Sequence, residues 1–161
     1  MFLPELQIQL SNIGANLKYF KSICNKETEI GIVVKCDAYG LGLKKIVKFF
    51  STQNVKTYFT ATLEEAIQVR KTDKSAIIYT LNGFYFEKVL DYQRYNIYPV
   101  INNIIEVKKF LAADFGPTGG AVQINSGMNR LGINRKTLKE NINLIKKIPI
   151  NLIISHLSSA D

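Results

Sequence analysis

Short runs of β-branched and aromatic residues alternate with helical patterns along most of this chain, and this alternation constrains its fold more than any other feature. The sequence predicts strands over 30–35, Thr57–Thr60, Ala76–Leu81, Ile97–Ile101, Ala121–Asn125 and Asn151–His156. It predicts helices over 43–50, Leu63–Lys71, Phe84–Tyr92, Ile104–Ala113 and Lys136–Lys147. Strands separated by helices indicate βαβ units and therefore a parallel sheet.

The number of strands sets the size of the expected fold. Six βα-type strands follow one another from Ile30 onward, whereas a (β/α)8 barrel has eight strands and typically about 250 residues. At 161 residues, the chain is expected to be an α/β protein that forms an incomplete (β/α)8 TIM-like barrel with about six of the eight βα units. Residues 1–161 are interpreted as one partial barrel domain that ends near its sixth strand and leaves the first and sixth strands as unpaired edges.

The segment before the first βα unit has a pattern of its own. Residues Leu6 to Leu10 alternate apolar and polar side chains, which predicts a half-buried strand. Ser11 then provides a helix cap, and Ile13 and Leu17 begin the apolar stripe of a first helix.

Composition limits the kinds of partner, such as nucleic acid, membrane or metal, that the chain is expected to bind. Lysine supplies 17 of the 21 basic residues behind the net charge of +8, but the lysines are scattered, with doublets at most. Nucleic-acid surfaces cluster their basic residues, so solvated helix faces are the preferred interpretation and no nucleic-acid partner is expected. No apolar run approaches the roughly 20 residues of a membrane span. Cys24 and Cys36 fit no disulfide or metal framework, which favours the cytoplasm and predicts no metal site.

The junction after the first predicted strand is the first candidate site. The β-branched run stops at Lys35, and Tyr39, Gly40 and Gly42 follow before the next helix begins. Strand ends carry the chemistry of parallel α/β folds, and a partly desolvated lysine there can serve as a Schiff-base amine. Tyr39 and the amides near the two glycines could contact a phosphate. The same spacing is also typical of a surface lysine that closes an ordinary strand.

Two further predicted strands end near candidate residues. Arg130 follows the fifth strand within Ser126–Gly132, where its planar guanidinium could hold a carboxylate or a phenolate, although a surface arginine in a glycine loop has the same pattern. His156, the only histidine, lies at the end of the sixth strand. A lone histidine is more often structural or solvent-facing than catalytic.

Taken together, these segments resemble the alanine racemases. Residues 34–42, Val-Lys-Cys-Asp-Ala-Tyr-Gly-Leu-Gly, resemble the family's pyridoxal-phosphate lysine motif V-K-A-[ND]-A-Y-G-H-G. Residues 122–132 resemble [VL]-K-[VI]-D-[TS]-G-M-x-R-[LI]-G, and residues 155–161 resemble [ST]-H-[FLM]-[AS]-x-A-[DE]. Residues 63–66, Leu-Glu-Glu-Ala, resemble the opening of the family's second helix.

Four positions depart from the family's patterns. Cys36 and Leu41 replace an alanine and a histidine but leave the lysine, tyrosine and glycines in place. Gln123 stands where many members have a lysine, often carbamylated and braced against the arginine, and Asn125 replaces an aspartate. Gln123 brings no negative charge, so Arg130 is expected to be less firmly oriented than in those members.

The resemblance implies a pyridoxal 5'-phosphate enzyme that interconverts L- and D-alanine and supplies D-alanine for peptidoglycan. It implies that Lys35 is the Schiff-base lysine and one catalytic base, that Tyr39 contacts the cofactor phosphate, and that His156 packs near the ring. Arg130 would contact the cofactor's phenolic oxygen and the substrate carboxylate. Family members are homodimers with a C-terminal β-domain, which this chain is expected to lack, together with the second base that the family takes from the partner's domain.

Three alternatives stay open at the level of sequence. The chain could be a non-catalytic pyridoxal-phosphate-binding barrel, or one part of a split racemase that another chain completes. A racemase for another amino acid, such as serine or lysine, is also consistent with the motifs. If the chain derives from a racemase, the isolated chain is expected to be an inactive fragment.

Overall fold

Six parallel strands form one curved sheet in the computed structural model, which describes residues 5–115 and 119–159. The strands lie side by side in chain order and each neighbouring pair is parallel. They are β1 (Ile32–Val33), β2 (Thr57–Thr60), β3 (Ile77–Thr80), β4 (Tyr98–Ile101), β5 (Gly120–Ile124) and β6 (Ile150–Ser155). The predicted α/β partial barrel with six strands is therefore confirmed.

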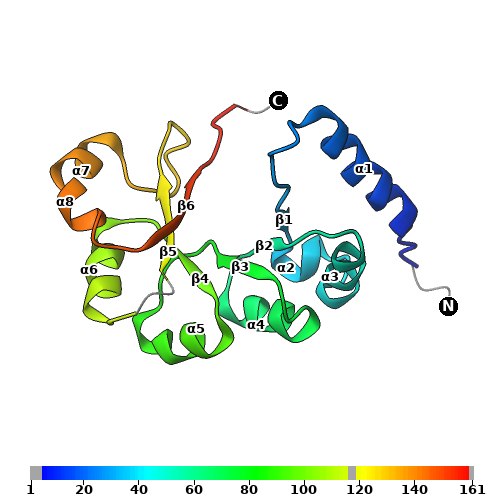
Figure 1. The fold of residues 1–161 in the computed structure, drawn as a ribbon, viewed down its shortest axis with the longest axis horizontal. Coiled ribbons are helices and arrows are strands. Elements are labelled where there is room, and N and C mark those ends of the chain that lie inside the picture. Colours follow the sequence, from blue (N-terminus) through cyan, green and yellow to red (C-terminus); the bar gives the residue numbers. More distant parts are fainter. Residues whose placement is uncertain (1–4, 116–118, 160–161) are drawn as a thin grey trace.

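Helices follow the outer rim of this sheet, and the strands lie on the inner side of the curve (Figure 1). The helices are α1 (Leu10–Ile23), α2 (Lys35–Tyr39), α3 (Leu43–Thr52), α4 (Leu63–Thr72), η1 (Phe86–Lys88), α5 (Val89–Tyr95), α6 (Ile104–Ala112), α7 (Arg135–Glu140) and α8 (Ile142–Ile145). Side-chain caps from Thr62, Asn103 and Asn134 begin α4, α6 and α7, because each accepts a backbone amide of the first turn.

The main hydrophobic core lies between the sheet and the outer helices. Alternate strand residues such as Tyr58, Ile78 and Ile101 are fully buried there against the helices. Burial raises the pKa of the Tyr58 and Tyr92 phenols, the latter to about 12, so both hydroxyls stay neutral. This core fixes the strand positions and thereby the residues that follow each strand.

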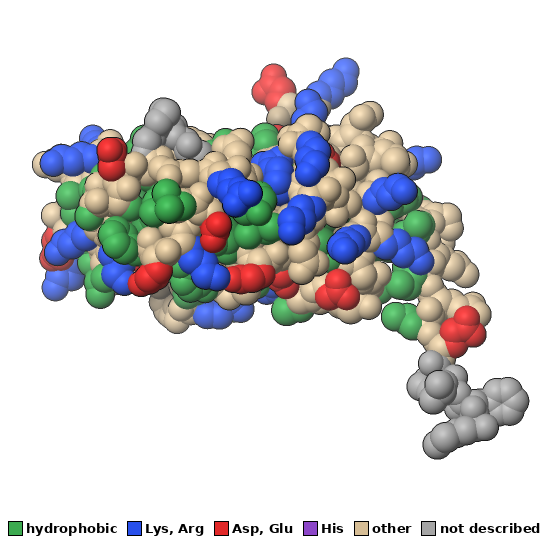
Figure 2. Space-filling view, turned by 90° about the horizontal axis from the view of Figure 1, so that it is seen from below, with side chains coloured by type: hydrophobic (Ala, Val, Ile, Leu, Met, Phe, Trp, Pro, Cys, Tyr) green, Lys and Arg blue, Asp and Glu red, His purple; other side chains and the backbone are tan. Residues whose placement is uncertain are grey.

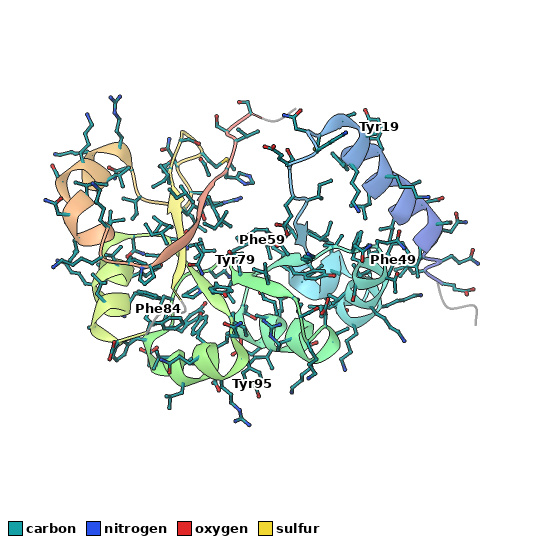
Figure 3. The ribbon with its side chains drawn as sticks, viewed as in Figure 1. Tyr19, Phe49, Phe59, Tyr79, Phe84 and Tyr95 are labelled. Carbon is teal, nitrogen blue, oxygen red and sulfur yellow. The ribbon has the colours of Figure 1, made fainter. Side chains whose placement is uncertain are left out.

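A second apolar group lies on the inner side of the sheet. The rings of Phe59 and Tyr79 stack with centroids 5.3 Å apart and planes 18° apart, and Tyr98 continues the row at 5.3 Å from Tyr79. Figure 3 shows Phe59 and Tyr79 on this inner side, whereas Phe84 lies toward the helices. The stack forms a floor across β2, β3 and β4.

The two outermost strands have one neighbour each. Among the described residues, β1 pairs only with β2, and β6 only with β5. The side chain of Ile153 on β6 is 67% exposed and that of Val33 on β1 is 40% exposed. The sheet thus presents two open edges with apolar side chains, as the strand count predicts.

Several local predictions were wrong. Residues Leu6 to Gln9 form no strand, because the described part of the chain places no strand beside them, and Leu6 is largely exposed. Helix α1 begins at Leu10 with Gln9 in the cap position, so Ser11 lies inside the helix and does not cap it. The first strand is only two residues long.

The predicted helices near Phe84 and Lys136 lie where the sequence indicates, but each is divided into two shorter elements. The first is a 3-10 turn, η1, followed by α5, which extends to Tyr95. The second divides into α7 and α8 at Asn141. The Asn141 side-chain amide donates to the carbonyl of Thr137, a local bond that competes with regular helix geometry.

Charges of both signs occur on the outer helical surface. The space-filling view from below shows basic side chains on this face together with acidic and apolar ones (Figure 2). Lys88 and Glu64 form an ion pair of 2.5 Å, which lowers the pKa of Glu64 through that hydrogen bond. Among the helices of the described residues, none has the length and apolar character needed to cross a membrane.

Candidate active site

One cavity of about 500 Å³ lies at the C-terminal ends of the strands and brings together all four residues that the sequence singled out. Lys35 reaches it from the end of β1, Arg130 from the loop after β5, and His156 from the end of β6. Tyr39 lines the same cavity, and so does Gln123 of β5. Residues that are far apart in the chain therefore converge on one space, as expected for the functional end of a parallel α/β fold.

Lys35 is half-buried and immediately follows β1. The amide of Val34 donates to the carbonyl of Phe59 at 2.8 Å, so the backbone just before Lys35 is still held by β2. The Lys35 amine lies 5.9 Å from the centroid of the Tyr39 ring, within the range of a cation–π contact. No hydrogen bond from a described residue occupies this amine, which leaves it available to a ligand in the cavity.

The segment after Lys35 is a left-handed helical turn. Cys36, Asp37, Ala38 and Tyr39 have φ values of 53°, 54°, 54° and 57°, although none of them is glycine. This conformation costs roughly 1–2 kcal/mol per residue for L-amino acids, so neighbouring contacts must impose it. The Ala38 side chain is buried, and the Cys36 amide donates to the Glu65 carboxylate at 2.6 Å. Strain concentrated at a cavity wall is a common mark of a functional site.

The backbone amides near Gly40 and Gly42 are not free to hold a phosphate, contrary to the expectation from sequence. Gly40 donates to the carbonyl of Cys36 at 3.0 Å, and Gly42 to the carbonyl of Asp37 at 3.0 Å. The Leu43 amide at the start of α3 donates to the Asp37 side chain at 2.7 Å. These three backbone amides therefore form hydrogen bonds within the left-handed turn and at the start of α3. The Tyr39 side chain, 63% exposed and on the cavity wall, keeps its hydroxyl available.

Arg130 is held on a closed loop. The amide of Asn125 donates to the carbonyl of Ile133 at 3.0 Å, and the amide of Ile133 donates to the carbonyl of Gln123 at 2.8 Å, so the loop returns to the strand that it left. Gly132 has a φ of +100°, and a Cβ there would lie 2.8 Å from the Asn125 nitrogen. A glycine is therefore required for this return.

The two departures from the family's pattern at β5 have different consequences. The Asn125 side-chain oxygen accepts the amides of Gly127 at 3.0 Å and Asn129 at 3.1 Å, contacts that an aspartate could also make. Gln123 is buried beside the cavity. No hydrogen bond joins Gln123 to Arg130 among the described side chains, so the guanidinium is exposed and unbraced in this structure.

His156 is the last predicted site residue, and its position depends on the contacts between β5 and β6. The Ser126 hydroxyl lies 2.6 Å from the Ser155 hydroxyl and also donates to the His156 carbonyl at 3.3 Å. These bonds join the loop of Arg130 to the backbone of His156. The imidazole itself is exposed and lines the cavity. The last two residues of this motif, Ala160 and Asp161, lie outside the described residues.

Sequence reasoning missed several other residues on the cavity wall. Phe59, Leu81, Leu131 and Ile154 supply apolar surface, and Asn82 supplies a polar side chain after β3. Strand alternation could have indicated Phe59 and Ile154, because they occupy inward positions on their strands. Asn82 lies in an Asn-Gly pair after a predicted strand, which looks like an ordinary turn.

Comparisons with known proteins show what this chain is similar to. Residues 8–161 match the family described as "Alanine racemase, N-terminal domain". The chain is 35% identical over 170 residues to the alanine racemase of Rickettsia prowazekii, and it is 34% identical to that of Rickettsia canadensis. The alignments cover 100% of this chain but only 41% and 47% of the two relatives. The chain thus spans less than half the length of these relatives.

Solved structures give the same result. The alanine racemase of Bartonella henselae, which carries covalently bound pyridoxal phosphate, superposes with a TM-score of 0.85 at 28% identity. The biosynthetic alanine racemase of Pseudomonas aeruginosa superposes with a TM-score of 0.84 at 30% identity. Each match covers 94% of this chain, and 44% and 43% of those chains respectively. The protein described here belongs to the alanine racemase N-terminal domain family.

Proposed function

We propose that this chain is the cofactor-binding part of a pyridoxal-phosphate-dependent amino-acid racemase that acts on alanine. The observation that carries the proposal is the convergence of Lys35, Tyr39, Arg130 and His156 on one cavity of about 500 Å³. Such a volume suits a small cofactor together with an amino acid. The cavity offers an unoccupied amine, a phenol, a guanidinium and an imidazole beside apolar walls, and this set of groups fits an aldehyde-bearing aromatic phosphate.

Each residue has a distinct role in the proposal. When bound, pyridoxal phosphate supplies an aldehyde that condenses with amines and a ring that withdraws electrons from the attached carbon. Lys35 holds the cofactor through its amine and moves the α-proton on one face of the substrate. The Tyr39 hydroxyl donates to the phosphate. Arg130 orients the substrate carboxylate and the ring oxygen with its planar donors, and His156 packs against the ring.

The isolated chain is expected to bind the cofactor but not to racemise alanine. Racemisation needs a proton carrier on each face of the planar carbon, and Lys35 serves only one. In the proposal, the second carrier comes from a partner subunit of a homodimer. Conversion of L- to D-alanine by the purified chain at ordinary enzyme rates would contradict this view.

D-alanine supply for peptidoglycan is the proposed cellular role, and the two free thiols favour a cytoplasmic setting.

Cofactor trapping tests the proposal. The purified chain is incubated with pyridoxal phosphate and reduced with borohydride, and the modified lysine is located by peptide mass mapping. Of the 17 lysines, Lys35 is expected to be labelled selectively, and Lys35→Arg to abolish that label. Labelling spread over surface lysines, unchanged by Lys35→Arg, would contradict the proposal.

The open edges of the sheet favour a second candidate, in which the chain is one part of an assembly. Because β1 and β6 each have one neighbour among the described residues, further strands could pair with both. Mixing the chain with a polypeptide that corresponds to the remaining length of a relative, and assaying alanine racemisation, would test it. Activity of the mixture that neither part shows alone is the expected result.

A further inference from the structure

Glu65 occupies the first turn of α4 and divides its two carboxylate oxygens between two different segments. One oxygen, Oε2, accepts the amides of Ala61 at 2.8 Å and Thr62 at 3.3 Å. In return, the Glu65 amide donates to the Thr62 hydroxyl at 3.3 Å, which completes a capping box. This oxygen therefore serves the start of its own helix.

The other oxygen, Oε1, reaches the neighbouring strand end. It accepts the amide of Cys36 at 2.6 Å, across 29 positions of sequence. Cys36 directly follows Lys35 and is the first residue of the left-handed turn. A hydrogen bond to a carboxylate is shorter and stronger than one between neutral groups, so it is suited to hold a strained segment.

We propose that Glu65 is a positioning residue for Lys35, a proposal that rests on the proposed function because Lys35 is its cofactor lysine. The bond fixes the peptide plane between Lys35 and Cys36, and this plane sets the direction in which the Lys35 side chain leaves the backbone. Without it, the four left-handed residues can relax toward the right-handed conformations that L-amino acids prefer. The Lys35 amine would then lose its fixed place beside Tyr39.

The chain contains a second glutamate with similar hydrogen bonds, which provides a matched control for Glu65. Glu106 occupies the same place in the first turn of α6, where its amide donates to the Asn103 side chain at 3.0 Å. Its carboxylate accepts the Asn102 amide at 2.8 Å and the Asn103 side-chain amide at 2.7 Å. Glu106 therefore anchors the end of β4 much as Glu65 anchors the end of β2, but it neither contacts the segment of Lys35 nor lines the cavity.

The experiment compares Glu65→Gln with Glu106→Gln. In Glu65→Gln, one arm of the side chain becomes an NH2 group, which must face a backbone donor in either orientation. Two quantities are measured in each protein. One is the rate at which pyridoxal phosphate and borohydride label Lys35, relative to the remaining lysines. The other is hydrogen–deuterium exchange of the backbone amides of residues 35–40. Circular dichroism confirms that each variant is folded under the conditions used.

Glu65→Gln is expected to slow relative labelling of Lys35 about tenfold, as for loss of one charge-assisted hydrogen bond. It is also expected to speed amide exchange at Cys36 by a similar factor. Glu106→Gln should leave both quantities within about twofold of the unsubstituted protein. Equal effects of the two substitutions, or no effect of Glu65→Gln, would overturn the proposal.

Two further results keep the test decisive. If Glu65→Gln does not fold, Glu65→Asp replaces it, because the shorter carboxylate keeps its charge at α4 but cannot hold Ala61 and Cys36 together. Slower labelling of Lys35 and faster exchange at Cys36 are again expected. If the unsubstituted chain shows no selective label at Lys35, the proposed function fails. Amide exchange at Cys36 then decides separately whether Glu65 holds the turn.

Discussion

Asn125 and Asn129 exchange two hydrogen bonds across the loop that carries Arg130. The Asn129 amide donates to the Asn125 side-chain oxygen at 3.1 Å, and the Asn125 side-chain nitrogen donates to the Asn129 side-chain oxygen at 3.0 Å. Asn129 has a φ of 55°, a conformation that asparagine tolerates better than most residues. This pair fixes the turn one residue before the guanidinium enters the cavity.

Asn125→Ala removes both of these bonds and the bond from the Gly127 amide to the Asn125 side-chain oxygen, and it is expected to lower the free energy of unfolding by about 1 kcal/mol or more. Asn125→Asp keeps the side-chain oxygen for the amides of Gly127 and Asn129 and loses only the donor, so a smaller cost is expected. Urea unfolding of both variants measures the difference. If both substitutions lower the free energy of unfolding equally, the side-chain oxygen at position 125 does not stabilise this loop.

Gly31 approaches the aromatic floor closely. A Cβ at this position would lie 2.7 Å from Cε2 of Phe59, whose ring is stacked on Tyr79 and cannot move freely. Gly31→Ala is expected to lower the free energy of unfolding by about 1–3 kcal/mol through overpacking. The cost should shrink in a Phe59→Leu background, because the clashing ring is gone. Thermal or urea unfolding of the double-mutant cycle tests this, and strictly additive effects would contradict it.

Much of the fold could be predicted from the chain because strands and turns have local signals. β2 spans Thr57–Thr60 as predicted, since these four residues form a short β-branched and aromatic run. The alternation at Leu6 to Leu10 has the same local signal, yet those residues form no strand because the described part of the chain gives them no partner strand. Alternation of apolar and polar residues shows that a segment could fit the edge or face of a sheet, but it does not show that a partner strand is available.

The convergence at the cavity could be predicted, but the path of the backbone there could not. Parallel strands bring their carboxyl ends to one edge, and this places Lys35, Arg130 and His156 together. The left-handed turn after Lys35 has no local signal, because Cys36 and Ala38 favour right-handed backbone. The Glu65 carboxylate is held close by its own helix cap and imposes the turn through a contact between distant segments.

The pH dependence of stability should contain a contribution from Glu106. Burial raises the pKa of its carboxyl, and hydrogen bonds from Asn102, Asn103 and Phe84 only partly oppose this effect. Between the ordinary pKa and the raised one, the folded state binds more protons than the unfolded state. The contribution of Glu106 is therefore full below the unfolded pKa and declines as the pH rises through the folded pKa.

Comparison with Glu106→Gln isolates this contribution, because the amide does not titrate. Urea unfolding of both proteins between about pH 4 and pH 7 gives the difference in free energy at each pH. The advantage of the unsubstituted protein should be largest at the acidic end and should fall as the pH rises. A difference that grows with pH would reverse the assigned sign.

The edge at β6 should promote self-association. Ile153 is 67% exposed on a strand with one partner among the described residues. Ile153→Lys places a charge on this edge and is expected to reduce association in light scattering while changing the free energy of unfolding by less than about 0.5 kcal/mol.

Leu90→Lys is the control for that substitution, because Leu90 is 75% exposed on a helix and not at a sheet edge. It removes a similar apolar side chain and adds the same charge. If both substitutions reduce association equally, net charge is responsible and the edge is not.

We propose that one half-open barrel assembles the cofactor site from three strand ends. A crystal structure of the chain after reduction with pyridoxal phosphate and borohydride is the sharpest test of this assembly. We predict continuous density from the Lys35 amine to the cofactor, with the Tyr39 hydroxyl at the phosphate and Arg130 and His156 in contact with the ring. Density attached to another lysine, or a cofactor on Lys35 that leaves Arg130 and His156 without contact, would contradict the claim.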